Sequence, residues 1–181
     1  MSTYKQSIPQ ADTLMGSMRS MGYSFEAAIA DVIDNSISAN CNVVKIFFPS
    51  EPTDELVVGI LDDGEGMPAD VLFEAMRYGS TDSELERRAN DLGRFGLGMK
   101  SASLSQCRIL TVVSLYADKL SSYSWDFNCI QKRKEWIVKE LSQTEIKSLP
   151  YIDSLLELSH GTLVLWQDFD VLEKSSGGLV Y

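Results

Sequence analysis

The sequence is poor in the residues that form disulfides and metal clusters, because its 181 residues include three cysteines and one histidine. Cys41, Cys107 and Cys129 are odd in number and widely spaced. This spacing matches neither a disulfide framework nor a zinc site. We therefore expect the protein to be cytoplasmic, in a reducing environment.

Long apolar runs are also missing. No run approaches the ~18 residues that a membrane helix needs. The first ten residues, MSTYKQSIPQ, lack the charged-then-apolar layout of a signal peptide. We expect no membrane partner.

Basic residues are outnumbered, with 16 Lys and Arg against 26 Asp and Glu and a formal net charge of −10. Direct contact of this domain with nucleic acid is thus disfavoured, since such contacts need clustered cations. A basic run at 132–134 alternates with apolar residues and is expected at the solvated edge of a hairpin. Nucleotide binding is not excluded, because backbone N–H groups and a few local cations suffice for a phosphate.

The chain has the length and the 44% hydrophobic content of one globular domain. We place this domain at residues 1–170. Residues 171–181 are expected to be a linker or a truncation point before a missing C-terminal region.

The order of elements predicts an α/β two-layer sandwich with a mixed, largely antiparallel sheet covered on one face by helices. Helices are expected early in the chain and antiparallel strands late. The predicted helices span 11–21, 25–39, 68–77, 98–106 and, as a helical stretch, 143–157. The predicted strands span 43–48, 56–61, 108–116, 120–127, 134–140 and 162–167.

A glycine-rich run before the predicted helix at 98–106 is typical of an anion site. Gly93, Gly96 and Gly98 let backbone N–H groups approach a phosphate, and a helix start adds unpaired donors. Lys100 supplies a mobile positive charge. Such a run also occurs for packing reasons alone. The polar residues 79–92 in front of it are predicted to form a lid.

The predicted helix at 25–39 has two faces. Its apolar stripe includes Val32 and Ser36, and Asp31 and Asn35 lie on the opposite stripe. That polar stripe can simply face solvent. A carboxylate and an amide four residues apart can also hold a hydrated Mg²⁺ and orient a water molecule.

A second polar element ends the predicted strand at 56–61. Asp62 follows the apolar run directly, so its carboxylate must find a donor, and an adenine amine is suitable. Gly64 and Gly66 would leave room for a flat base. A tight Asp-Gly turn into a helix begun by Pro68 is the simpler interpretation.

Taken in order, these elements resemble the GHKL ATPases, the gyrase B, heat-shock-90, histidine kinase and MutL type with the Bergerat ATP-binding fold. The similar elements are Asp31-x-x-x-Asn35, Asp62-x-Gly64-x-Gly66, Gly93-x-x-Gly96-x-Gly98 and the strand that begins Gly161-Thr162. They cover about residues 20–168. The sequence around Asn35 and Lys100 is most similar to that of MORC-like and related bacterial ATPases.

The resemblance implies ATP and Mg²⁺ as cofactors and a role for each matching residue. Asp31 would be the general base, Lys100 a catalytic phosphate stabiliser and Asn35 the Mg²⁺ ligand. Asp62 would accept the adenine amine with help from Thr162. The remaining nucleotide contacts would come from Gly64, Gly66, Met67, Gly93, Arg94, Phe95, Gly96, Leu97 and Gly98.

Two departures from the family pattern leave the reaction open. Hydrolytic members carry Glu where this chain has Asp31, which is one methylene shorter, and misplacing a water by about an ångström can cost ~10²-fold in rate. Ser38 stands where a carboxylate is common. The sequence thus predicts an ATPase whose lid closure over ATP drives dimerisation or a conformational change in a larger protein, with a non-hydrolysing ATP sensor as the alternative. A protein kinase is the third possibility, although His160 lies in a loop and not on a dimerising helix.

Overall fold

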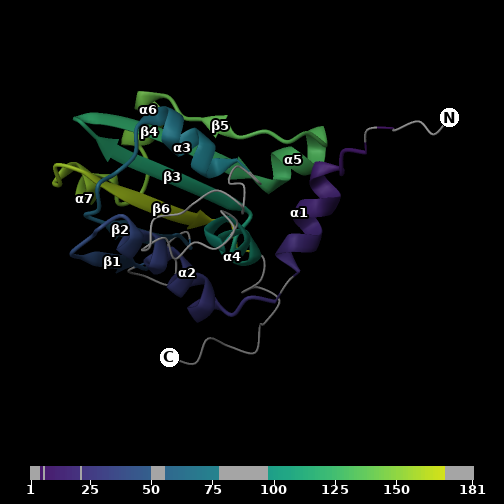
Figure 1. Cartoon of the computed structure of the whole chain (residues 1–181), viewed down its shortest axis with the longest axis horizontal. Coiled ribbons are helices and arrows are strands. Elements are labelled where there is room, and N and C mark those ends of the chain that lie inside the picture. The colour runs from purple at the N-terminus through teal and green to yellow at the C-terminus, as the bar shows by residue number, and fades with distance from the viewer. Residues whose placement is uncertain (1–4, 6, 21, 50–55, 78–97, 170–181) are drawn as a thin grey trace.

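A computed structural model describes residues 5, 7–20, 22–49, 56–77 and 98–169, with Gly98 and Met99 described by their backbone alone (Figure 1). The helices are α1 (Ala11–Arg19), α2 (Phe25–Ser38), α3 (Ala69–Met76), α4 (Gly98–Gln106), α5 (Phe127–Arg133), α6 (Gln143–Lys147) and α7 (Ile152–Leu156). The strands are β1 (Val44–Phe47), β2 (Val58–Asp62), β3 (Ile109–Tyr116), β4 (Lys119–Asp126), β5 (Lys139–Glu140) and β6 (Gly161–Gln167). Within these ranges no helix combines the length and the apolar character needed to cross a membrane.

The strands form one six-stranded sheet in the order β1-β2-β6-β3-β4-β5. Every pairing among the described strands is antiparallel, so the expected mixed sheet is antiparallel throughout this part of the chain. The α/β layered class is confirmed. The last of the described strands, β6, lies between β2 and β3 in the interior of the sheet.

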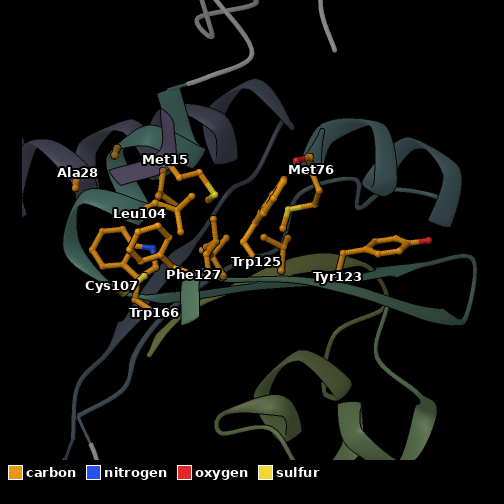
Figure 2. Packing of buried hydrophobic residues seen from close by; sticks show 14 of the residues in the cluster. Met15, Ala28, Met76, Leu104, Cys107, Tyr123, Trp125, Phe127 and Trp166 are labelled. Carbon is orange, nitrogen blue, oxygen red and sulfur yellow. Dashed lines mark hydrogen bonds between the residues drawn. The ribbon is translucent and has the colours of Figure 1, made fainter. Parts of the chain in front are cut away.

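The larger core fills the space between one face of the sheet and helices α1 to α5 (Figure 2). Met15 of α1 and Leu104 of α4 meet Trp125 and Trp166 of the sheet there. Small residues predominate in α4, and this helix packs against α1 and α2. Helix α1 is therefore part of the main core.

The opposite face of the sheet is also covered, which corrects the expectation of helices on one face only. Its apolar side chains, among them Leu163 and Leu165, pack against Ile146 of α6 and Ile152 and Leu155 of α7. Strand β6 is buried along nearly its whole length, because both of its faces are covered.

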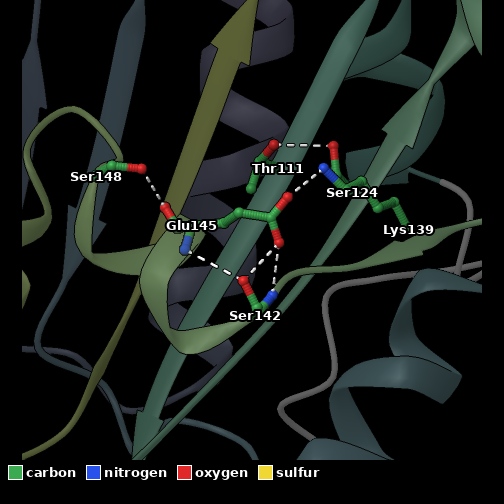
Figure 3. Close-up of polar contacts among 6 residues, drawn as sticks. All are labelled: Thr111, Ser124, Lys139, Ser142, Glu145 and Ser148. Carbon is green, nitrogen blue, oxygen red and sulfur yellow. Dashed lines mark hydrogen bonds and ion pairs between the residues drawn. The ribbon is translucent and has the colours of Figure 1, made fainter.

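Local sequence signals account for several helix boundaries. The Ser24 side chain accepts from the Ala27 N–H at the start of α2. In α6 the Ser142 and Glu145 side chains each cap the other's backbone, and Lys139 pairs with Glu145 (Figure 3).

The predicted hairpin near residue 132 is wrong. Residues 127–133 form α5, because the Asp126 side chain caps the Cys129 N–H. The helix ends at Arg133, and Lys134 caps it in a left-handed conformation.

Candidate nucleotide-binding site

One end of the sheet is polar on the face that the larger helix layer covers. Alternate residues of a strand share a face, and the apolar side chains of Val58 and Ile60 are followed on that face by Asp62. Thr162 lies directly opposite Asp62 on β6, and Ser114 lies opposite Thr162 on β3. Three strands thus place polar side chains side by side, beneath the C-terminal half of α2.

Asp62 is the centre of this polar end. Its side chain is only 5% exposed. One carboxylate oxygen accepts from the Ser36 hydroxyl of α2 at 2.8 Å, and the other accepts from the Gly64 N–H at 3.0 Å. Burial raises the pKa of Asp62 above its ordinary value, although these donors and the Thr162 N–H oppose that rise. Such a buried acceptor suits the exocyclic amine of adenine.

The turn after Asp62 needs its two glycines for contacts within the protein. A Cβ on Gly64 would lie 2.9 Å from Ala39 and from the Asp62 carboxylate. Gly66 has a φ of +68°, and its Cβ would lie 2.3 Å from the Leu115 carbonyl oxygen. Packing of the turn explains both glycines, and room for a base beside them stays a prediction.

The same turn is fastened to its surroundings. The Met67 N–H donates to the Ser114 hydroxyl at 2.7 Å. Asp63 accepts from the Asn42 and Val43 N–H groups at 2.7 and 2.8 Å, and these donors lower its pKa. The turn that carries Asp62 is therefore rigidly placed before any ligand arrives.

The polar stripe of α2 is where the sequence predicted it. Asp31 is half-buried and Asn35 is exposed, whereas Val32 and Ser36 are buried. The Asn35 side-chain N–H donates to the Asp31 carbonyl at 2.6 Å. With its nitrogen engaged, Asn35 has its side-chain oxygen as the atom that can bind a cation.

These donors fit Mg²⁺ in kind. Magnesium takes oxygen ligands, usually one or two from the protein with the rest from phosphates and water. Asn35 supplies such an oxygen, and Asp31 lies one helical turn away. Within the described ranges no three His, Cys, Asp or Glu side chains gather as a metal cluster. A cation here would thus take most of its ligands from water and from the phosphates of a bound nucleotide.

Lys100 has a different environment from the one that the sequence suggested. Its side chain is 2% exposed, and its ammonium donates to the Ala75 and Arg77 carbonyls at 2.8 and 2.5 Å. The Met76 carbonyl between them accepts from Trp125. Lys100 therefore links the C-terminus of α3 to the first turn of α4. Burial lowers its pKa to about 8.

Part of the predicted phosphate site lies outside the described residues. This holds for Gly93, Arg94, Phe95, Gly96 and Leu97, for the proposed lid at 79–92 and for the predicted linker at 171–181. Gly98 begins α4 as expected. The structure brings Asp62, Gly64, Gly66, Met67 and Thr162 together at one end of the sheet.

Sequence reasoning missed three residues of this site. Ser36 was placed on the apolar stripe of its helix without a role, although it is the one polar member of that stripe. Ser114 ends an apolar run of β3 and had no assigned role. His160 was interpreted as a turn residue, and its Nδ1 lies 2.6 Å from the Gly64 carbonyl oxygen.

The comparisons with known proteins agree with this geometry. A family model described as histidine kinase-, DNA gyrase B- and HSP90-like ATPase matches residues 23–162. The chain therefore belongs to this family of ATPases, and the predicted GHKL resemblance is confirmed. Membership indicates ATP binding. No curated protein matches the chain significantly.

Proposed function

We propose that this chain binds ATP with Mg²⁺ between α2 and the polar end of the sheet, and that it hydrolyses the ATP. The observation that carries the proposal is the buried Asp62 carboxylate, which is held by Ser36 and Gly64 beside Thr162. A buried acceptor of this kind selects a base that carries an amine. Family membership supports the same ligand.

The adenine base would bind beside the turn that follows Asp62. Asp62 would accept the exocyclic amine, and Thr162 would assist from the neighbouring strand. Gly64, Gly66 and Met67 would line the base and the ribose. Little rearrangement is needed here, because the protein's own hydrogen bonds already fix this turn.

The phosphate side would use residues 93–98 and the N-terminus of α4, whose N–H groups favour an anion. Lys100 would stabilise the terminal phosphate. For that contact its ammonium must leave the Ala75 and Arg77 carbonyls that hold it in this structure. We expect the exchange to occur on ATP binding, because a phosphate is a stronger partner than a carbonyl.

Residues of α2 would carry out the hydrolytic step. Asp31 would accept the proton of the attacking water as general base. Asn35 would hold the Mg²⁺, which would neutralise phosphate charge when bound. The short Asp31 side chain predicts slow turnover.

Two measurements test this function. Calorimetry with ATP should give Mg²⁺-dependent binding to the wild-type chain, weakened at least about tenfold in Asp62→Asn through loss of a charged acceptor. Phosphate release should be measurable and should fall ~10²-fold or more in Asp31→Asn. Failure of the wild-type chain to bind adenine nucleotides would refute the proposal.

A non-hydrolysing ATP sensor is the second candidate. Two features favour it. The Asp31 side chain is short, and the buried Lys100 ammonium already donates to the carbonyls at the end of α3. Tight binding without phosphate release, unchanged in Asp31→Asn, would select the sensor over the ATPase.

The larger context is also a proposal. We infer a cytoplasmic domain spanning residues 1–170, with 79–92 as its lid and further domains after 171–181. Lid ordering over ATP would drive dimerisation, in a MORC-like manner, or a conformational change in the larger protein. Light scattering with and without a non-hydrolysable ATP analogue tests the dimer.

A further inference from the structure

The single histidine of the chain contacts the turn that carries Asp62. His160 immediately precedes β6, and its Nδ1 lies 2.6 Å from the Gly64 carbonyl oxygen. A carbonyl can only accept, so Nδ1 carries the hydrogen and donates it. The contact therefore defines the tautomer of the neutral ring.

The peptide that receives this hydrogen bond is held at its other end as well. The carbonyl of the peptide group between residues 64 and 65 accepts from His160, and the N–H of that peptide, on Glu65, donates to the Ala39 carbonyl at 3.0 Å. Ala39 caps the C-terminus of α2. One peptide group thus bridges the loop before β6 and the helix that carries Asp31 and Asn35.

This bridge acts next to the adenine acceptor. Gly64 also donates its own N–H to the Asp62 carboxylate at 3.0 Å. A Cβ at Gly64 would be only 2.9 Å from Asp62 and Ala39, so the turn has little space in which to shift. Without a donor to the Gly64 carbonyl, this peptide would be held only through the Glu65 N–H, and even a small shift of Gly64 would lengthen the hydrogen bond from its own N–H to Asp62.

We propose that His160 is a positioning residue of the nucleotide site, which fixes the peptide after Gly64 and so holds Asp62 in place for the adenine base. The inference rests on the proposed binding of adenine nucleotides. His160 acts through the turn, on the base side of the site. Loss of the His160 side chain should therefore weaken the binding of AMP and of ATP by the same factor.

The test uses substitutions that keep or remove the donor at Nδ1. The side-chain nitrogen of Asn occupies nearly the place of Nδ1, whereas that of Gln reaches further, towards the place of Nε2. We expect His160→Ala and His160→Gln to weaken the binding of both AMP and ATP about fivefold, which corresponds to the net contribution of one neutral hydrogen bond. His160→Asn should restore affinity to within about twofold of wild type. The exposed neighbour substitution Ser159→Ala is the control and should bind like wild type.

Calorimetry of the four variants and the wild type separates the possible outcomes. Absence of wild-type nucleotide binding contradicts the proposed function itself. Wild-type binding with unchanged affinity in His160→Ala contradicts the role of His160 alone. A loss confined to ATP would also overturn it, since that would place the effect at the phosphates.

A second readout needs no nucleotide. Because the sequence has one histidine, its ring nitrogens can be assigned in a ¹⁵N NMR spectrum without ambiguity. The neutral ring should be the Nδ1–H tautomer. An Nε2–H tautomer would overturn the proposal, since Nδ1 would then have no hydrogen to donate.

Discussion

At the scale of single residues, Asp62 combines burial with several hydrogen-bond donors. Burial raises its pKa above the ordinary 3.8, and the donors from Ser36 and Gly64 lower it again. A raised folded-state pKa means that the proton on Asp62 stabilises the fold at low pH, and that this contribution is lost as the pH rises through that pKa. ATP affinity should behave in the opposite way, because binding needs the carboxylate.

Ser36 is the residue that tests this balance. Ser36→Ala removes a donor to a buried carboxylate, so the pKa of Asp62 should rise further. ATP affinity should then be lost at a higher pH than in wild type as the solution is acidified. We also expect a loss of about 1–3 kcal/mol in unfolding free energy.

The matched control for this prediction is Ser38→Ala, two residues further along α2. The Ser38 hydroxyl donates to the Asp34 carbonyl of its own helix at 2.9 Å. Urea unfolding and calorimetry over a pH series should leave this variant close to wild type. Equal effects of the two substitutions would contradict the role of Ser36.

At the scale of elements, the turn between β2 and α3 depends on a left-handed backbone that touches β3. Gly66→Ala would place a Cβ 2.3 Å from the Leu115 carbonyl oxygen at a φ of +68°. We expect a cost of about 3 kcal/mol or more, together with weaker ATP binding. Gly22 is the control, because its φ is +74° with open space around the Cβ position. Gly22→Ala should cost only about 1 kcal/mol in thermal or urea unfolding.

The junction of α3 and α4 depends on Lys100. Its folded-state pKa is lowered by burial from 10.5 to about 8. Between these values the unfolded chain binds more protons, so Lys100 makes stability rise with pH across that window. Lys100→Met should remove this rise. The exposed substitution Lys147→Met should retain it when unfolding free energy is measured across the same window, and an unchanged profile in Lys100→Met would contradict the buried position of the ammonium.

At the scale of the whole molecule, the core extends beyond the residues that define the family. Helix α1 precedes the matched residues 23–162, and its Met15 is 1% exposed in the main core. Met15→Ala should cost about 2–5 kcal/mol by creating a cavity. Leu14 is 38% exposed, and Leu14→Ala should cost less than about 1 kcal/mol. Urea unfolding of both variants checks that α1 is integral to the domain.

The parts of the fold that sequence could predict are those set by neighbouring residues. Ser24 is a residue type that favours the start of a helix, and helical periodicity separates Val32 from Asp31, because both signals act within a few turns. The contact of Ser36 with Asp62 depends instead on how α2 lies over the sheet. No local pattern specifies that placement.

Which residues lie next to each other across the sheet could not be predicted, for the same reason. Thr162 and Ser114 meet only because β6 lies beside β3, and His160 reaches Gly64 across 96 positions of sequence. Thr162 was predicted as a neighbour of Asp62 only through the family resemblance, because a family pattern reflects the three-dimensional structure that its members share. His160 and Ser114 had no such source and were found only in three dimensions.

The central position of β6 has a consequence for how the chain acquires its structure. β1 and β2 form one hairpin and β3 and β4 another, and these hairpins lie on either side of β6, which follows both of them in the sequence. Until β6 enters between them, the sheet is divided in two, and Asp62 lacks its neighbour Thr162. Such distant pairings make folding slow. A nucleotide bound at Asp62 would therefore stabilise only chains in which β6 is in place, so that ATP favours the fully paired sheet over partly assembled intermediates.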